Sequence, residues 1–437
     1  MQMKKSWFVG AVALAFVTGC PGEGEDGDVG DTGTAGGCAD PSDPDAPRLS
    51  ITEEIDGDTT WTCDNIYLLD QTVVFVSNGT LTIEAGTTIE GTAGSALVVT
   101  DTARIDAQGT SSAPVVMTSS QPAGQRQRGD WGGLVLIGTA PVNLDGGFGV
   151  AEGFQIPLNY GGADPGHDCG SLAYTRVEWA GFEISVDNEL NGITFYACGT
   201  GTTVDHVQVH MGSDDGMEMF GGGFDASHVI ITGAGDDSID CDQGYRGTLS
   251  NVFVQQDPAV GDACFEWSNG SNFTATPLTG PTVVNGTCVG SGGNGDKSKG
   301  AILKEGTEAG LIDTIFANIT NDFILLETPE TQLSAEGGGI TVDGTLFCGA
   351  NGFGVGEDED APGWTVEELL AWVEMAGSNQ VGADCALPSV TWGSPDVQPP
   401  PGSAPDGGGM GGGYAGAVDP SGENWTLEPW VTYATGS

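Results

Sequence analysis

Positive charge is scarce in this sequence. Its 437 residues include 11 lysines and arginines against 61 aspartates and glutamates, so the formal net charge is −50. A chain this acidic repels nucleic acids and anionic lipid surfaces, and we expect neither as a partner. The acidity fits a solvated cell-surface protein or a protein that collects divalent cations. Composition alone does not choose between these two.

Long apolar runs are also lacking, apart from a short one near residue 10. Two lysines precede this run, which ends in Val17-Thr18-Gly19-Cys20 and is too short to span a membrane as a stable helix. It indicates a signal peptide over residues 1–19. Its last four residues resemble the bacterial lipobox, which implies cleavage before Cys20 and lipid on the Cys20 sulfur. An ordinary secretory signal is the alternative.

The residue after the lipobox bears on location. Pro21 stands where such lipoproteins carry Asp when they stay in the inner membrane, so the resemblance implies the outer membrane. Display at the cell surface is the preferred orientation, and a periplasm-facing one stays open. Residues 20–48 contain almost nothing apolar and predict an acidic, disordered tether.

Nine of the ten cysteines follow Cys20. In an oxidising compartment most of them should pair, and an odd number leaves at least one thiol free. Cys241, Cys264 and Cys288 compete for one bridge, and Cys241 falls at an inward position where a free thiol would be buried. The other preferred pairs are Cys38–Cys63, Cys169–Cys198 and Cys348–Cys385.

A repeat organises the middle of the chain. Shifting the sequence by 22 residues places Asp214-Asp215 on Asp236-Asp237 and Met217-Glu218-Met219 on Ile239-Asp240-Cys241. A fixed period of this size, with short strands and Gly/Asp turns, is typical of stacked coils. We therefore predict an all-β fold, a right-handed single-stranded parallel β-helix over residues 49–345. Further matches join residues 191–195 to 215–219, 239–241 to 265–267, and 301–303 to 323–325.

The C-terminal quarter departs from this rhythm. Residues 362–377 have helical apolar spacing, Thr365 as a cap and Gly377 as a stop, and predict a short helix. This helix lies within residues 346–393, which we expect to form a C-terminal helical cap on the solenoid. Residues 394–437 begin as a Gly/Pro-rich, flexible arm and end in a tail with two tryptophans, which should pack on the body.

Several motifs carry a family resemblance. The chain resembles uncharacterised bacterial outer-membrane lipoproteins that are predicted right-handed β-helices and are sometimes labelled multidrug transporters. The resemblance implies the fold and the compartment only, and the lack of a spanning segment gives transport no support. The motifs are GDWGGLVLIG, GSDDGMEMFGG, GDDSIDCDQGYRG, NFTATP and the C-terminal GAVDP with NWTLEPW.

Stacked coils would place equivalent residues about 4.8 Å apart. Carboxylates that close repel each other and need a cation or a retained proton. We expect Ca²⁺ at Asp214, Asp215, Asp236 and Asp237, because Ca²⁺ takes several carboxylate ligands. Satisfaction of turn backbone N–H groups is the alternative role of these residues. The predicted columns are Thr194, Glu218, Asp240 and Glu266, then Asp214, Asp236 and Asp262, and then His206 and His228 beside Arg176 and Asn251.

Two functions follow. The leading one is a surface-displayed lipoprotein that binds a glycan or another surface component through a face comprising Glu218, Asp240, Glu266, His206, His228 and Arg246. The alternative is polysaccharide cleavage, because GDDSID is similar to the paired-aspartate motif of polygalacturonases. That resemblance implies catalytic roles for Asp215, Asp236, Asp237 and Asp240, although the Gly-His-Gly and Arg-Ile-Lys motifs of those enzymes are absent. A calcium-dependent lyase with Arg246 or Lys297 as base is a further variant.

Overall fold

A computed structural model describes residues 37–154, 156–185, 188–293, 297–349, 351–356 and 363–435, with the side chains of 183–189 excluded. The described residues belong to one compact unit, Gly37–Ser437. The predicted signal peptide and the lipidation site Cys20 lie outside the described residues. Among the described residues, no helix is long and apolar enough to cross a membrane.

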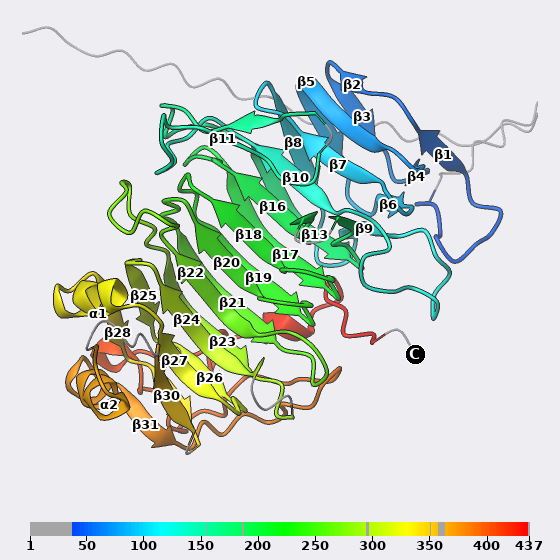
Figure 1. The fold of residues 1–437 in the computed structure, drawn as a ribbon. Coiled ribbons are helices and arrows are strands. Elements are labelled where there is room, and N and C mark those ends of the chain that lie inside the picture. Colours follow the sequence, from blue (N-terminus) through cyan, green and yellow to red (C-terminus); the bar gives the residue numbers. More distant parts are fainter. Residues whose placement is uncertain are drawn as a thin grey trace, which may run out of the picture. The chain divides into compact units, whose positions relative to one another are not determined.

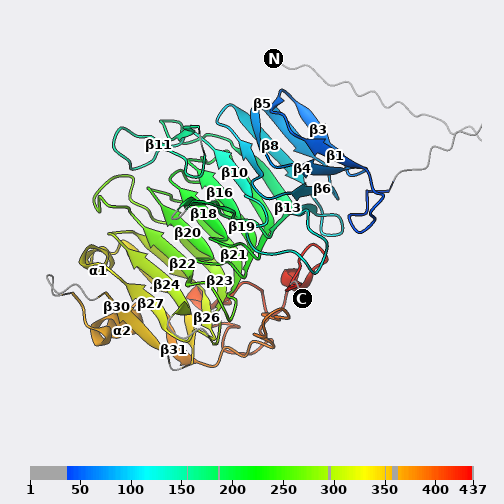
Figure 2. The same cartoon turned by 45° about the vertical axis from the view of Figure 1, so that its right-hand side comes forward.

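Parallel strands stack coil upon coil through this unit (Figures 1 and 2). One ladder, here called the first wall, receives one strand from each coil. Its strands are β2 (Ile55–Asp56), β5 (Val73–Ile83), β7 (Ala96–Val99), β10 (Leu134–Ile137), β16 (Ile193–Tyr196), β18 (Met217–Phe220), β20 (Ile239–Asp242), β22 (Ala263–Ser268), β24 (Lys299–Lys304), β27 (Asp322–Leu326) and β30 (Gly352–Val355).

The other ladder, the second wall, closes each coil. Two antiparallel pairs also occur, β11 (Gly149–Val150) with β12 (Asn159–Tyr160) and β14 (Glu183–Ser185) with β15 (Asn188–Glu189). The second wall contains β1 (Arg48–Ile51), β3 (Thr59–Trp61), β4 (Ile66–Leu69), the C-terminal half of β5, which joins β3 to β8, β6 (Thr88–Gly91), β8 (Ala103–Gln108), β9 (Val115–Ser119), β13 (Gly170–Glu178), β17 (Thr203–His210), β19 (Ala226–Thr232), β21 (Thr248–Gln255), β23 (Thr282–Val289), β25 (Ala309–Ile312), β26 (Ile315–Ala317), β28 (Ile340–Asp343), β29 (Leu346–Cys348) and β31 (Gln380–Ala383). The prediction of an all-β parallel β-helix is confirmed.

The second wall bends in the middle of its long strands. Equivalent residues of consecutive coils adopt the left-handed backbone conformation there, with φ of 45–56° at Tyr174, His206, His228, Asn251 and Asn285. A single left-handed residue turns the chain sharply, and asparagine tolerates that conformation best after glycine. The prediction that Asn251 stands in one column with His206 and His228 is therefore confirmed. The prediction that Arg176 belongs to this column is wrong. Arg176 pairs in register with Gln208, and Tyr174 is the residue that stands beside His206.

Strand register places the repeats as predicted along most of the first wall. Thr194, Glu218, Asp240 and Glu266 occupy successive rungs. The predicted match of residues 301–303 with 323–325 is wrong by one residue, because Ala301 pairs with Ile324 and not with Phe323. A one-residue slip exchanges the two faces of a strand, and the observed register keeps Ile324 in the core beneath Ala301.

The interior between the walls is apolar and closely packed. Phe195, Phe265, Trp267 and Phe316 are completely buried there. The disulfides are Cys38–Cys63, Cys169–Cys198, Cys264–Cys288 and Cys348–Cys385, and Cys241 is a buried free thiol. The three preferred pairs are thus present, and the open competition resolves in favour of Cys264–Cys288.

Helices close the C-terminal end, where α1 (Pro329–Glu336) and α2 (Val366–Met375) lie near each other in both views (Figures 1 and 2). Thr365 forms a capping box with Glu368, as its position before the helix predicts. The predicted boundary of the strands at residue 345 falls too early, because β29, β30 and β31 continue the ladders. At the other end, part of the predicted tether is attached to the body, since Ala39 N donates to Cys63 O at 2.6 Å.

The C-terminal segment lies against the outside of the second wall. Trp425 and Trp430 pack with Ile230 and Phe253, whose side chains project outward from β19 and β21. Short 3₁₀ turns at Met410–Gly412 and Trp425–Leu427 interrupt this segment. The Gly/Pro-rich arm is also attached, since Asp313 accepts a hydrogen bond from Met410 N.

Candidate functional site

The acidic residues of the repeat gather on the outside of the first wall. Glu218 lies on β18 and Asp240 on β20, directly paired, with Thr194 before them and Glu266 after them. In the preceding turns, Asp262 N donates to Asp236 O at 2.9 Å and Asp236 N approaches Asp214 O at 3.5 Å. Residues far apart in the sequence are therefore neighbours, as the repeat predicts.

Two of the aspartates beside this face are buried. Asp215 is 7% exposed and Asp237 is 5% exposed. Both side chains accept backbone N–H groups from the following coil, with Asp215 Oδ1 2.9 Å from Asp237 N and Asp237 Oδ1 2.6 Å from Ala263 N. Asn191 starts this ladder by accepting from Asp215 N at 3.2 Å. One oxygen of each aspartate thus satisfies the turn backbone, which was the alternative role.

Electrostatic repulsion is concentrated at the middle rungs. Burial, followed by the charge of neighbouring carboxylates, raises the pKa values of Asp215, Glu218, Asp237 and Asp240 well above their usual range. On the later coils of this face, lysines neutralise the carboxylates: Lys299 pairs with Asp262 at 2.7 Å, and Lys304 pairs with Glu266. Across the described part of the chain, no lysine or arginine forms an ion pair with any of the four.

Three overlapping groups of carboxylates have the spacing that a cation needs. Within each group, one oxygen per residue lies within 4.8 Å of the others. Oxygens that bind the same Ca²⁺ at 2.3–2.6 Å are at most about 5 Å apart, so each group fits. The four predicted metal residues do not form one set, because Glu218, Asp240 and Asp262 join them. The groups are Asp214–Asp215–Asp236, Asp215–Glu218–Asp240 and Asp236–Asp237–Asp262.

One atom distinguishes the middle group from the other two. Asp240 Oδ1 is shielded from solvent and has no hydrogen-bond partner among the described residues. Leaving a buried acceptor unpaired costs about 1–3 kcal/mol, and more when it is charged. A bound cation or a retained proton would remove that cost. Asp215–Glu218–Asp240 is therefore the strongest candidate for a cation site.

A polar hollow of about 400 Å³ adjoins the end of β20. Asp242, two residues after Asp240 on the same face of the strand, lines it together with Gln243 and Asn272. Its walls are turns held together by Asn143 Nδ2, which donates to Asn269 Oδ1 at 2.9 Å. Burial raises the pKa of Asp242 to about 6. The repeat did not reveal this hollow, because its lining residues come from irregular turns between coils.

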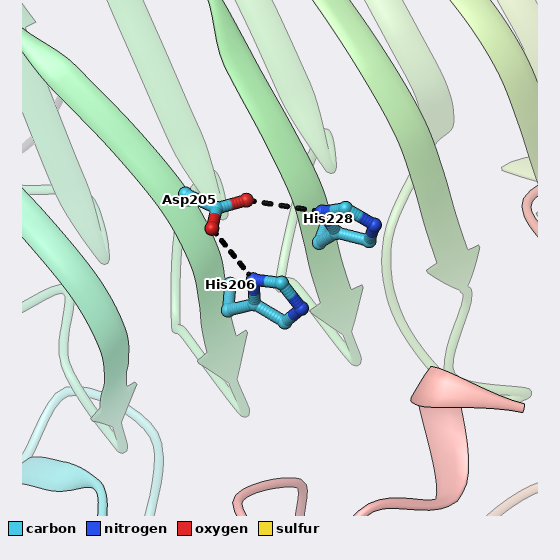
Figure 3. A group of neighbouring side chains, drawn as sticks. All are labelled: Asp205, His206 and His228. Carbon is cyan, nitrogen blue, oxygen red and sulfur yellow. Dashed lines mark hydrogen bonds and ion pairs between the residues drawn. The ribbon is translucent and has the colours of Figure 1, made fainter. Parts of the chain in front are cut away.

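The predicted histidine pair belongs to the other wall (Figure 3). His206 and His228 stack with ring centroids 4.1 Å apart, and their Nδ1 atoms lie 2.8 and 3.0 Å from the two oxygens of Asp205. Burial acts to raise the pKa of Asp205, but the hydrogen bonds of both histidines outweigh it and hold that pKa well below its usual value. The pair is therefore wrongly grouped with Glu218 on one ligand face.

Arg246 is also engaged elsewhere. Its Nη1 atom lies 2.6 Å from Glu308 and donates to Leu278 O at 3.0 Å. Its charge therefore neutralises a carboxylate that does not belong to the column of Glu218, Asp240 and Glu266. Trp131 and Trp179 are buried as well, since Trp131 is 0% exposed and Trp179 is 5% exposed.

Comparison with known proteins agrees with this architecture. A family described as the pectate-lyase-like β-helix domain matches residues 52–394. No curated protein and no solved structure matches the chain. The match spans well over half of the sequence and coincides with the stacked parallel strands. This chain therefore belongs to the pectate-lyase-like β-helix family, a membership that fits a carbohydrate-related role.

Proposed function

We propose that this protein is a cell-surface β-helix that binds a glycan without cleaving it, with Ca²⁺ ordering its acidic face. The observation that carries the proposal is the Asp215–Glu218–Asp240 group, whose oxygens lie within 4.8 Å of one another beside a polar hollow. Oxygen-only ligands select hard cations such as Ca²⁺. A bound Ca²⁺ would neutralise the three carboxylates and so hold the surface around β18 and β20 in a single arrangement.

The hollow supplies the glycan-binding surface of the proposal. Amide and carboxylate side chains such as Asn272, Gln243 and Asp242 offer both donors and acceptors to sugar hydroxyls. Gln243 is held in place because Tyr160 Oη donates to its Oε1 at 2.6 Å. A pre-positioned polar lining lowers the entropic cost of binding a flexible sugar.

Calorimetry tests the cation. Titrating Ca²⁺ into the metal-free protein should show a site that Asp240→Asn weakens at least tenfold, because the amide keeps the shape but loses the charge. Asp101→Asn is the matched control, since Asp101 is exposed. Equal Ca²⁺ binding by wild type and Asp240→Asn would contradict the site.

Glycan binding is tested with a panel of soluble polysaccharides, each screened in the presence of Ca²⁺ and in the presence of a chelator. Absence of binding under both conditions would reject the proposed function.

Polysaccharide cleavage is the second candidate, and one observation favours it. A carboxyl whose pKa is near 6 in a polar hollow has the property of a general acid, and Asp242 meets this description. The four aspartates that the polygalacturonase resemblance implies as catalytic residues fit this reaction less well. Asp215 and Asp237 are buried backbone acceptors. Asp215 also has an oxygen within 4.8 Å of Asp236 and one within 4.8 Å of Asp240, closer than the 6.5–9.5 Å that separates the carboxyl groups of inverting hydrolases. Reducing-end and unsaturated-product assays on acidic glycans separate cleavage from binding.

The outer membrane is the proposed location. The lipobox-like Val17–Cys20 supports attachment through lipid on Cys20, followed by an acidic spacer. Expression with labelled palmitate in a bacterial host should label the wild type and not Cys20→Ser. Surface display then predicts that external protease removes the protein from intact cells. An unlabelled wild-type chain would contradict the anchor.

A further inference from the structure

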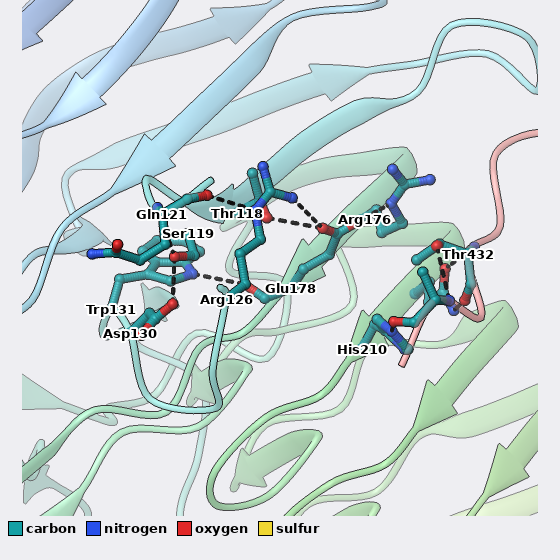
Figure 4. A network of polar contacts seen from close by, with 12 residues as sticks. Thr118, Ser119, Gln121, Arg126, Asp130, Trp131, Arg176, Glu178, His210 and Thr432 are labelled. Atoms are coloured by element: carbon teal, nitrogen blue, oxygen red, sulfur yellow. Dashed lines mark hydrogen bonds and ion pairs between the residues drawn. The ribbon is translucent and has the colours of Figure 1, made fainter. Parts of the chain in front are cut away.

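A second charged hollow lies on the opposite ladder from the acidic face, at the outer surface of the second wall (Figure 4). Its floor is formed by Arg176 and Glu178 of β13 and by His210 of β17. The loop after β9 brings Arg126 over this floor, and the C-terminal segment forms the facing side through Thr432. The hollow has a volume of about 170 Å³, which is room for one small molecule.

The charges around this hollow do not balance. Among the described residues that line it, two guanidinium groups face a single carboxylate, because Arg176 and Arg126 both pair with Glu178. Burial acts to raise the pKa of Glu178, but Arg176 and its other partners lower it below the usual value, so the carboxylate is ionised. In a chain of net charge −50, a local surplus of one positive charge is unusual.

His210 adds no charge to the floor. Its Nε2 atom lies 2.8 Å from Ala434 O, an acceptor only, so Nε2 carries the proton. Its Nδ1 atom then accepts from Thr232 Oγ1 at 2.6 Å. Burial, the largest influence, lowers the pKa of His210, which agrees with this neutral tautomer. The surplus charge therefore stays on the two arginines.

Arg126 is the less tightly held of the two. Its Nη1 atom is 3.5 Å from Glu178, longer than the 2.7–2.9 Å of a strong charge-assisted hydrogen bond. Its Nε atom donates to Gln121 O at 3.0 Å within the same loop. Its side chain is only 21% exposed, so water compensates its charge poorly. This guanidinium has donor capacity left for a second anion.

We infer that this hollow binds a small carboxylate-bearing molecule between Arg126 and Arg176. The planar guanidinium fork matches carboxylate geometry and supplies the missing negative charge. Trp179, beside His210 with ring centroids 5.7 Å apart, gives the hollow an apolar side for the body of the ligand. The site lies on the other wall from the acidic column and does not depend on the proposed cation.

Calorimetry with the full mature protein tests the inference. Sodium acetate, sodium glucuronate and glucose are titrated separately at constant ionic strength. Binding of acetate and glucuronate without glucose identifies the carboxylate as the recognised group. Tighter binding of glucuronate than of acetate points to an acidic sugar as the source, and equal binding points to a simple carboxylic acid. Failure of both anions to bind overturns the inference.

Variants locate the site. Arg126→Gln should weaken carboxylate binding roughly tenfold or more, because it removes a charge-assisted pair, and Arg126→Lys should fall between Arg126→Gln and the wild type. Arg104→Gln is the control, since Arg104 pairs with Asp168 and does not line the hollow. The thermal midpoint without ligand should be similar for the wild type and Arg126→Gln. Unchanged binding by Arg126→Gln would place the anion elsewhere and refute the assignment.

Discussion

At the residue scale, the acidic face couples stability to pH. Asp215, Glu218, Asp237 and Asp240 all have raised pKa values because burial and neighbouring carboxylates disfavour their charged forms. A group whose pKa is raised by folding stabilises the protein at low pH and loses that contribution as the pH rises. Without a cation, the folded protein should therefore be more stable in mild acid than at neutral pH.

Asp242 provides a measurable case. Folding raises its pKa from the usual 3.8 to about 6, so its contribution is complete below about pH 4 and is lost as the pH rises through about 6. At 1.36 kcal/mol per pKa unit, the loss is on the order of 3 kcal/mol or less. Urea unfolding in a chelator at pH 4.5 and 7.5 should show this fall in the wild type and a smaller fall in Asp242→Asn. Equal falls in wild type and variant would contradict it.

At the element scale, the two helices show when a sequence pattern suffices. In α2, Leu369 and Val373 are one turn apart and buried, and Thr365 caps the first turn. This apolar stripe made the helix predictable. In α1 the buried residues are Thr331, Gln332 and Ala335, so no apolar stripe marks it. Its position beside β28 and β24 becomes evident only in the folded chain.

The cap helix should contribute to stability through its buried face. Leu369→Ala should lower the free energy of unfolding by about 2–5 kcal/mol, because it leaves a cavity under the helix. Val366→Ala in the same helix is the matched control, since Val366 is 43% exposed and should change stability by about 0.5 kcal/mol or less. Urea denaturation followed by circular dichroism measures both. Similar values for the two variants would show that α2 does not seal the core.

At the scale of the whole molecule, the C-terminal segment completes the second wall. Gln208 Nε2 donates to Thr432 O at 2.7 Å, and Thr432 N donates to Gln208 Oε1 at 2.9 Å. Trp430, completely buried, covers the outward apolar side chains of β19 and β21. Without this cover, Ile230 and Phe253 would be exposed as an apolar patch, which promotes association.

Trp430→Ala should therefore destabilise the protein by about 3–5 kcal/mol. It should also make the last residues of the chain sensitive to protease and raise the tendency to aggregate. Leu427→Ala is the control within the same segment, because Leu427 is 51% exposed. Limited proteolysis and light scattering of the two variants check this. A protease-resistant tail in Trp430→Ala would mean that the segment is held by its hydrogen bonds alone.

The repeat of about 22 residues was sufficient to predict the coils, the rungs occupied by Glu218, Asp240 and Glu266, and the side of the strand on which each lies. Alternation along a strand and stacking between coils are local and periodic, so they are encoded locally. Where the period broke down, the prediction failed by one residue at Phe323. Three of the disulfides were also among the pairs preferred from the sequence.

Only the tertiary structure decided how deeply the acids are buried, which lysines neutralise them, and which turns form the polar hollow. It alone brought Arg126, Arg176, Glu178 and Thr432 together. These features depend on irregular loops and on a C-terminal segment that returns across the second wall. Long-range contacts of this kind leave no period in the sequence, because each joins segments that share neither spacing nor composition.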